Sequence, residues 1–312
     1  LKQRDLTINS LAVNLKTFEL LDVTGGYEDL KNGILRCYRE TSILEDPLRI
    51  FRFFRFQALY GFKIEENTLK MASKYAHLLD KPAVERKNYE ILKLFSGEYA
   101  HEALLSMDEA GILELLFPFV KDYKKVPPNT HHHLDLCHHI VETVKQIQEA
   151  YKTSPNSVKN HLEKCDFGAH SRLAHLKLAG FLHDIGKFST WTIDETGRHR
   201  FIKHDDVGAK LAKEFLTQAK FSKKQITYLC NMIKYHIYPS SLVTAPDVNE
   251  KAMMRFVRKM GEDAIDIITL AKADRLSARG QAIPDEMVET NLANLDKLQN
   301  FYLERKDAVV IK

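Results

Sequence analysis

An apolar run that ends in two polar side chains constrains this fold more than any other feature of the sequence. Residues 178–182 are apolar or glycine, and His183 and Asp184 follow at once. Such a run indicates a buried helix that carries an imidazole and a carboxylate at its end. Burial of both groups without partners would be costly. The fold must therefore bring further polar side chains to this point.

Four further side chains of the same chemistry are candidates for that role: His139, His204, His236 and Asp274. Imidazole with carboxylate suits a divalent cation such as Mn, Fe, Ni, Co or Zn, and no Cys-x-x-Cys pair offers thiolates. A metal held this way polarises a phosphoryl oxygen and activates water. We predict hydrolytic chemistry with Asp184 and Lys187 as catalytic groups, because Lys187 lies one turn beyond Asp184 and can meet phosphate, as can Arg275 and Arg279.

A single histidine on an apolar face is more often a hydrogen-bonded core residue, so His204 and His236 gain weight only beside the His183-Asp184 pair. The clustered histidines at 131–139 leave a choice open. His139 follows Asp135 by four residues and so shares its helical face. We take His139 as the ligand, and residues 131–133, Asp135 and His138 as its neighbours or as substrate contacts.

The order His, His-Asp, His, His, Asp resembles the ligand set of the HD phosphohydrolases. Residues 201–209 resemble the segment of that family that holds a second metal. The resemblance implies one or two divalent ions, drawn from Mn, Ni, Co, Fe or Mg. It places His139, His183, Asp184 and Asp274 on the first ion, with His204 and His236 helping to hold the second.

Three blocks in the first third of the chain carry a different signature, at residues 4–12, 21–30 and 45–56. In this order they resemble the bacterial class II CCA tRNA nucleotidyltransferases and their poly(A) polymerase relatives, in which a fused carboxy-terminal HD domain is a known arrangement. The resemblance covers residues 1 to about 100. It implies selection of CTP and ATP without a template and the tRNA acceptor end as partner. It also implies an HD domain that hydrolyses phosphate monoesters or 2′,3′-cyclic phosphates.

The same resemblance assigns roles to individual residues of these blocks. Asp46 and Arg49, three apart and so expected on one helical face, would select the nucleotide, and Arg52 continues a basic stripe along it. Arg86 and Glu90 match the neck motif that braces the site. The motif that contacts phosphates and ribose is matched by Arg4, Asp5 and Asn9.

In that family, the aspartate pair for magnesium and a glycine-rich turn precede the Arg-Asp motif. Only residues 1–3 precede Arg4 here. We expect an amino-terminally truncated chain, with nucleotidyl transfer and its Mg²⁺ belonging to the intact parent.

Composition is that of an ordinary globular chain, with 44% hydrophobic and 28% charged residues. The net charge of +4 permits RNA binding without demonstrating it. No apolar run reaches the length of a membrane span and no signal sequence is visible. Four dispersed cysteines fit reduced thiols. We predict a cytoplasmic protein without membrane partners.

The expected fold is mainly α. Residues 1–40 are a remnant of an α/β nucleotidyltransferase head with strands at 8–14, 19–23 and 34–38, and residues 41–120 are a helical neck and body. A linker at 121–130 precedes an all-helical HD domain at 131–283, which is interrupted by a hairpin-like loop at 190–201. Residues 284–312 are a carboxy-terminal helix.

Two other functions remain open beside that of a tRNA nucleotidyltransferase family protein with an HD phosphohydrolase domain. One is a stand-alone HD phosphohydrolase acting on nucleotides, and the other is a non-catalytic RNA-binding fragment. Metal content separates the last from the first two. The motifs are shared by CCA, CC-only, A-only and poly(A) addition.

Overall fold

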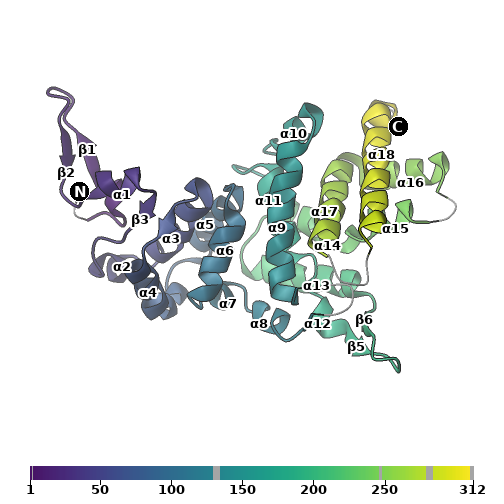
Figure 1. Ribbon diagram of the computed structural model, residues 1–312, viewed down its shortest axis with the longest axis horizontal. Helices are drawn as coiled ribbons and strands as arrows, with labels where there is room; N and C mark the ends of the chain where they lie inside the picture. The colour runs from purple at the N-terminus through teal and green to yellow at the C-terminus, as the bar shows by residue number, and fades with distance from the viewer. Residues whose placement is uncertain (2, 129–133, 246–247, 279–283, 310–312) are drawn as a thin grey trace. The chain divides into compact units, whose positions relative to one another are not determined.

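The computed structural model is mainly helical, which confirms the predicted fold class, and it divides into two compact units, residues 1–120 and 121–312 (Figure 1). It describes residues 1, 3–128, 134–245, 248–278 and 284–309, with side chains as far as residue 305. The histidine run 131–133 and Arg279 therefore lie outside the described residues.

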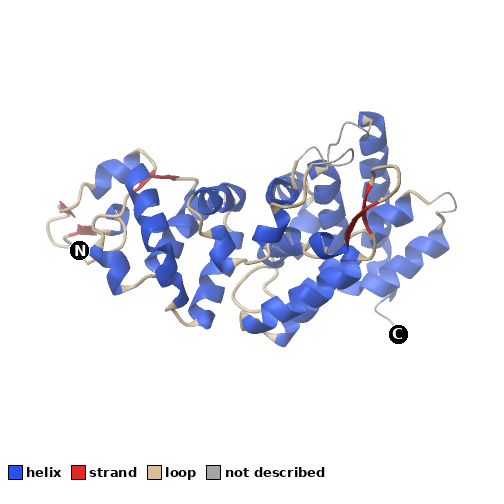
Figure 2. Ribbon diagram, turned by 90° about the horizontal axis from the view of Figure 1, so that it is seen from below, coloured by secondary structure: helices blue, strands red, loops and turns tan. Residues whose placement is uncertain are grey.

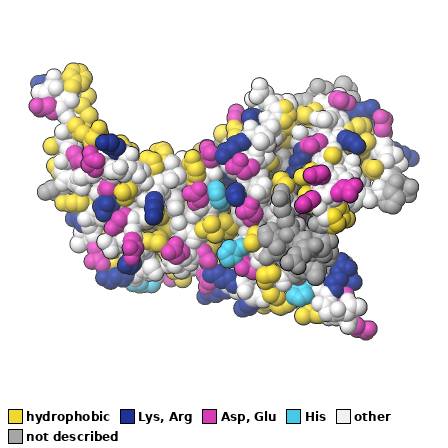
Figure 3. Space-filling model, in the orientation of Figure 1, with side chains coloured by type: hydrophobic (Ala, Val, Ile, Leu, Met, Phe, Trp, Pro, Cys, Tyr) yellow, Lys and Arg dark blue, Asp and Glu magenta, His cyan; other side chains and the backbone are white. Residues whose placement is uncertain are grey.

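The first unit opens with a small hairpin. Strand β1 (Leu11–Val13) follows a 3-10 turn, η1 (Thr7–Asn9), and pairs antiparallel with β2 (Leu20–Asp22), within the two predicted strand segments. Hydrophobic side chains gather on its projecting end (Figure 3), where Leu15 and Phe18 are 84% and 79% exposed.

A helix, α1 (Gly26–Lys31), lies between the strand segments predicted at 19–23 and 34–38. The Asp22 carboxylate accepts hydrogen bonds from the backbone N–H groups of Thr24, Gly26 and Tyr27 at 2.9–3.1 Å. This satisfies donors that the first turn of a helix leaves free. Gly26 is required here, because a Cβ at this position would lie 2.1 Å from the carbonyl oxygen of Thr7.

The third predicted strand is shorter than expected and has an unexpected partner. Strand β3 (Ile34–Leu35) pairs in parallel with β4 (Lys63–Ile64), inside a region that the sequence pattern marked as helical throughout. Gly61, at a φ of 68°, ends the preceding helix. The chain then turns so that the N–H groups of Lys63 and Glu65 reach the carbonyls of Gly33 and Leu35.

The body of the first unit is built around α3 (Arg49–Tyr60), which packs on α5 (Val84–Ser96) and α6 (Ala100–Glu109). Burial of Phe51, Phe53 and Phe54 explains the aromatic content of α3. The remaining elements are short: α2 (Thr41–Glu45), α4 (Glu66–Tyr75), η2 (Ala76–Asp80) and α7 (Leu113–Leu116).

The predicted linker at 121–130 contains part of a helix. Helix α8 (Val120–Tyr123) begins just before it, and the side chains of Tyr123 and Val126 are buried. Because these two side chains are buried, the segment around them packs against the protein instead of forming an exposed linker.

The core of the second unit consists of α9 (Leu136–Thr153), α11 (Arg172–Leu182) and α17 (Ala264–Ser277), which pack against one another. Helices make up most of this unit (Figure 2). Every residue of α11 is buried, as the apolar run predicted. The sequence explains its start as well, because the Ser171 side chain accepts the N–H of Ala174 at the amino-terminal end of the helix.

The other elements of the second unit surround this core. The hairpin-like loop predicted at 190–201 is an antiparallel pair, β5 (Trp191–Ile193) with β6 (His199–Phe201). The carboxy-terminal helix α18 (Asp285–Val309) packs on α15 (Tyr238–Val243), α16 (Glu250–Met260) and α17. The remaining helices are α10 (Asn156–Leu162), α12 (Lys187–Thr190), α13 (His204–Gln218), α14 (Lys223–Tyr235) and η3 (Gly261–Asp263).

Candidate metal centre

Five helices of the second unit bring the six predicted metal-binding side chains together. His183 and Asp184 follow the end of α11, and His236 follows the end of α14. His204 begins α13, while His139 lies on α9 and Asp274 on α17. All six come from ends or buried faces of helices, so the backbone fixes their positions.

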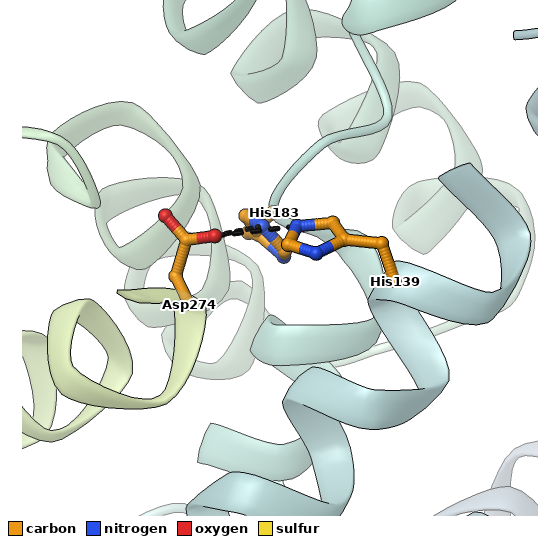
Figure 4. A group of neighbouring side chains, drawn as sticks. All are labelled: His139, His183 and Asp274. Carbon is orange, nitrogen blue, oxygen red and sulfur yellow. Dashed lines mark ion pairs between the residues drawn. The ribbon is translucent and has the colours of Figure 1, made fainter. Parts of the chain in front are cut away.

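A first group consists of His139, His183 and Asp274, whose side chains point toward one another (Figure 4). Their potential ligand atoms all lie within 4.8 Å of one another. Oδ1 of Asp274 is 3.2 Å from Nε2 of His139 and 3.5 Å from Nε2 of His183.

A second group consists of Asp184, His204 and His236, again with ligand atoms within 4.8 Å. The Nε2 atoms of His204 and His236 are 3.3 Å apart. Oδ1 of Asp184 lies 3.4 Å from the first and 3.8 Å from the second.

Asp184 joins the two groups through its two oxygens. While Oδ1 faces the second group, Oδ2 lies 3.3 Å from Nε2 of His139 and 3.2 Å from Nε2 of His183. From the sequence, Asp184 was predicted to belong to the first group alone. The geometry places it between both, because a carboxylate at the end of α11 can present one oxygen to each side.

Three of the histidines are oriented by backbone carbonyls. Nδ1 of His183 donates to Gly180 at 2.7 Å, Nδ1 of His204 donates to Phe201 at 2.8 Å, and Nδ1 of His236 donates to Ile233 at 2.6 Å. A neutral imidazole that donates from Nδ1 keeps a lone pair on Nε2. All three Nε2 atoms therefore face the centre as potential metal ligands, an orientation typical of metal-binding histidines.

The buried carboxylates require compensating positive charge nearby. Burial by itself would lower the pKa of His183, but Asp184 and Asp274 outweigh burial and raise that pKa to about 10. Burial would raise the pKa of Asp184 and Asp274, yet the neighbouring histidines, and Lys187 in the case of Asp184, hold both well below the usual range. A divalent cation would compensate the same negative charge, so this set of donor atoms fits a metal ion.

Burial has the opposite net effect on His236. It lowers the pKa of this imidazole to about 4, and the charge of His183 adds to the effect. A neutral imidazole is the form that binds a metal ion.

Lys187 lies against the centre rather than standing free in the pocket. Its Nζ is 2.6 Å from Oδ2 of Asp184 and lies over the ring of Phe201. The ammonium therefore neutralises part of the Asp184 charge and remains at the edge of the pocket that the centre opens into.

That pocket has a volume of about 490 Å³. Asp184, Lys187, His204, His236 and Asp274 form one part of its lining. The rest of the lining includes Arg275, which was predicted as a phosphate contact. It also includes residues that were not predicted as site residues: His199, Phe201, Ser240, Ser241, Thr244 and Asn291. A signal for Asn291 did exist, because it lies between Val288 and Leu295 on the buried face of α18.

Asp135 and His138, expected as neighbours of the centre or as substrate contacts, interact with each other at the start of α9. The Asp135 carboxylate accepts the backbone N–H of His138 at 3.0 Å and pairs with its ring nitrogen at 2.7 Å. The two residues cap the amino-terminal end of α9.

The predicted nucleotide-binding residues of the first unit form ion pairs. Asp5 pairs with Arg52 and accepts a hydrogen bond from Asn9 at 3.0 Å. Asp46 pairs with Arg86 at 2.8 Å. Glu90 receives two hydrogen bonds of 2.9 Å from Arg55. Arg4 is exposed.

One expectation about this group is wrong. Asp46 and Arg49 do not share a helical face, because Asp46 has an extended backbone at the end of α2 and Arg49 begins α3. The Arg49 guanidinium instead pairs with Glu45 at 3.3 Å. A Pro at position 47 favours this break, since it disfavours helical geometry in the residue before it.

Three family descriptions match successive parts of the chain. Residues 1–36 match the poly A polymerase head domain, residues 61–124 match the probable RNA and SrmB-binding site of polymerase A, and residues 136–279 match the HD domain. The A-adding tRNA nucleotidyltransferase of Deinococcus radiodurans is 31% identical over 286 residues, which cover 90% of this chain and 60% of the relative.

The chain belongs to the class II CCA tRNA nucleotidyltransferase and poly(A) polymerase family with an HD domain.

Other members are similar over the same range. The CC-adding tRNA nucleotidyltransferase of Thermus thermophilus is 27% identical over 286 residues, with 90% of this chain and 60% of the relative covered. The CCA-adding enzyme of Thermotoga maritima, solved in complex with tRNA, shares the fold with a TM-score of 0.56 at 21% identity. That likeness covers 97% of this chain and 63% of the solved one. The chain thus spans about 60% of the length of these curated relatives.

Within the described residues, no helix is both long enough and apolar enough to cross a membrane.

Proposed function

We propose that the second unit is a metal-dependent phosphohydrolase that acts on the phosphorylated end of an RNA or nucleotide. The observation that carries this proposal is the position of Asp184 between two groups of potential ligands. The ligand atoms of each group lie within 4.8 Å of one another. A carboxylate shared by two imidazole-rich groups is suited to two neighbouring divalent ions.

His139, His183 and Asp274 would hold one ion, His204 and His236 a second, and Asp184 both. Divalent ions supply Lewis-acid activation of the phosphoryl group and of the water that attacks it. Mn, Ni, Co, Fe and Mg are all compatible with these nitrogen and oxygen donors.

The chain's own residues would orient the substrate and hold charge. Lys187 keeps Asp184 ionised through its 2.6 Å contact, and its ammonium at the edge of the pocket can meet a phosphoryl oxygen. The Asp184 carboxylate supplies negative charge to both groups of ligands. Asp184 and Lys187 are therefore the proposed catalytic pair. The buried faces of α11 and α17 exclude water from one side of the centre.

We further propose that the first unit binds nucleotide and the tRNA acceptor end. Support comes from the Asp5–Arg52 and Asp46–Arg86 pairs, which hold donors and acceptors in fixed positions, and from relatives described as tRNA nucleotidyltransferases. Arg4, Asn9 and Arg49 complete the proposed binding set, and Glu90 holds Arg55 behind it. Nucleotidyl transfer from CTP or ATP with Mg²⁺ is a proposal for the whole protein.

The test is hydrolysis by the purified chain after metal removal and re-addition of Mn²⁺, Ni²⁺, Co²⁺ or Mg²⁺. The substrates are a 2′,3′-cyclic nucleotide and a tRNA that ends in a 2′,3′-cyclic phosphate. Metal-dependent turnover that is faster on the tRNA supports the proposal. Turnover on the free nucleotide alone would favour a stand-alone nucleotide phosphohydrolase. No turnover with any metal would reject hydrolysis and leave RNA binding as the function.

A further inference from the structure

The wall of the pocket contributed by α15, α17 and α18 is unlike the metal-facing part. It carries neutral polar groups and one guanidinium: Ser240, Ser241, Thr244, Arg275 and Asn291. None of these belongs to either group of potential metal ligands. The inference about this wall rests on the phosphohydrolase function proposed above. It concerns the part of the substrate other than its phosphate.

Asn291 is the most informative residue of the wall. It is only 4% exposed, and its Oδ1 is buried without a hydrogen-bond partner among the residues described. Its neighbours on the buried face of α18 are the apolar Val288 and Leu295. An unsatisfied buried amide is costly, and a leucine would fill this position at lower cost. The amide is therefore explained best by a ligand that enters the pocket.

Arg275 adds a second group, whose Nε has no hydrogen-bond partner among the described residues. Its Nε is buried without a hydrogen bond, and in the described part of the chain no carboxylate lies within 4.0 Å of its guanidinium, although Asp274 is its neighbour in sequence. Guanidinium binds phosphate through parallel hydrogen bonds. Arg275 thus offers a phosphate contact on the side of the pocket where Asn291 lies.

Helix α15 supplies hydroxyl groups. Thr244 donates its hydroxyl hydrogen to the carbonyl of Ser240 at 2.8 Å, which leaves the oxygen's lone pairs as acceptors. Ser240 and Ser241 add two further hydroxyls that both donate and accept. Such groups match the hydroxyls of a ribose.

We propose that this wall binds the nucleoside part of the substrate, and that Asn291 is a specificity-determining residue that selects a ribonucleotide end over other phosphoesters. The Asn291 amide offers a donor and an acceptor, the pair that a base edge such as that of adenine requires. Arg275 holds a phosphate, and the α15 hydroxyls contact the ribose. A volume of about 490 Å³ lies in the range of pockets that enclose small-molecule ligands.

The test compares two phosphodiesters that share the metal-dependent step. Adenosine 2′,3′-cyclic phosphate carries a nucleoside, whereas bis(p-nitrophenyl) phosphate does not. Asn291→Leu should lower kcat/KM for the first by at least about tenfold and leave the second within about twofold. The matched control is Asn294→Leu, one turn further along α18, where the amide donates to the carbonyl of Val243 instead of facing the pocket. It should change neither value.

A purely structural role for Asn291 makes different predictions. If the amide only stabilised the fold, Asn291→Leu would lower the melting temperature and reduce both activities by the same factor, and that result would overturn the proposal. We expect an equal or higher melting temperature, because a buried unsatisfied atom is removed. Arg275→Met provides an independent comparison: because it removes the proposed phosphate contact, it should lower kcat/KM for both phosphodiesters, unlike Asn291→Leu.

Failure of the proposed function can be told apart from failure of this inference. If neither phosphodiester is hydrolysed with any metal, the phosphohydrolase proposal fails. Calorimetric titration with 3′-AMP and with inorganic phosphate then decides on the wall. Weaker 3′-AMP binding in Asn291→Leu, with phosphate binding unchanged, supports nucleoside recognition. Equal 3′-AMP affinity in the wild-type chain and in this variant would overturn it.

Discussion

Asp184 faces two sets of imidazoles at once because it follows directly on the end of α11, at the point where α9, α13, α14 and α17 converge. Each of its oxygens lies 3.2–3.8 Å from the two histidine nitrogens of a different group. Removal of its charge should therefore affect both groups, whereas loss of a single histidine should affect one.

Asp184→Asn tests this directly. The substitution keeps the shape of the side chain but removes the negative charge that both ions would share, so we expect at most one bound ion per chain and hydrolysis reduced by at least about 100-fold. Metal content is measured by mass spectrometry after dialysis. Asp206→Asn, on the outer face of α13 where Asp206 pairs with Lys234, is the control. Full metal content in Asp184→Asn would contradict the shared role.

His175 provides a test of pH-dependent stability away from the centre. Burial lowers the pKa of this fully buried imidazole to about 4, although the Ser171 carbonyl opposes the shift. The unfolded chain takes up this proton near pH 6.5 and the folded chain does so only near pH 4, so stability present above pH 6.5 is lost as the pH falls toward 4. Between pH 7 and pH 5 the loss from this group is about 2 kcal/mol.

Urea titrations of wild type and His175→Gln at pH 7 and pH 5, both without metal, measure this contribution. The wild-type free energy of unfolding should fall by about 2 kcal/mol more than that of the variant. Equal falls in the two chains would show that His175 has no part in the pH dependence.

At the scale of elements, the position of the second ligand group depends on close contact between the segment after Asp184 and the start of α13. A Cβ on Gly186 would lie 2.1 Å from the carbonyl oxygen of His204 and 2.7 Å from the N atom of Gly208. No side chain fits there without movement of α13. His204, the first residue of α13, would move with it.

Gly186→Ala should therefore displace His204 from Asp184 and lower metal content by about one ion, since the group of His139, His183 and Asp274 lies on other helices. Gly208→Ala is the graded comparison, because its new Cβ would have no neighbour nearer than 3.2 Å. We expect a smaller loss there. Two ions retained in Gly186→Ala would contradict the proposed dependence on this contact.

The elements also show what the sequence could and could not predict. The fully buried α11 and the hairpin β5–β6 were predicted because their patterns are local, an apolar run in one case and turn residues in the other. The parallel pair β3–β4 and helix α1 were missed. They depend on a pairing between distant segments and on one capping carboxylate, Asp22, which hydrophobic periodicity does not report.

The same division between local patterns and contacts of distant segments holds for the candidate site. Side chains with distinctive chemistry, such as His183 and Asp184, were recognised, but the shared position of Asp184 required the convergence of helices. Asn291 was missed although Val288 and Leu295, three residues before it and four after it, mark its face of α18 as buried.

At the scale of the whole molecule, the proposed metal centre and the proposed nucleotide-binding residues belong to different compact units. The centre lies wholly within residues 121–312, and the Asp5–Arg52 and Asp46–Arg86 pairs lie within residues 1–120. The two activities should therefore be separable by substitution.

His183→Ala combined with Asp184→Ala should remove bound metal and phosphohydrolase activity while tRNA binding, measured by gel shift or fluorescence anisotropy, stays within about twofold. The reciprocal variant, Asp46→Asn with Arg86→Gln, should weaken tRNA or nucleotide binding and leave metal content unchanged. Loss of tRNA binding in the first double variant would argue against separate sites.

The most direct test of the account is an anomalous diffraction map from crystals of the chain grown with Mn²⁺. We predict two peaks on opposite sides of the Asp184 carboxylate, one among His139, His183 and Asp274 and the other beside His204 and His236. A single peak that involves only the first three residues, or no peak at any of the six, would contradict a two-ion centre joined by Asp184.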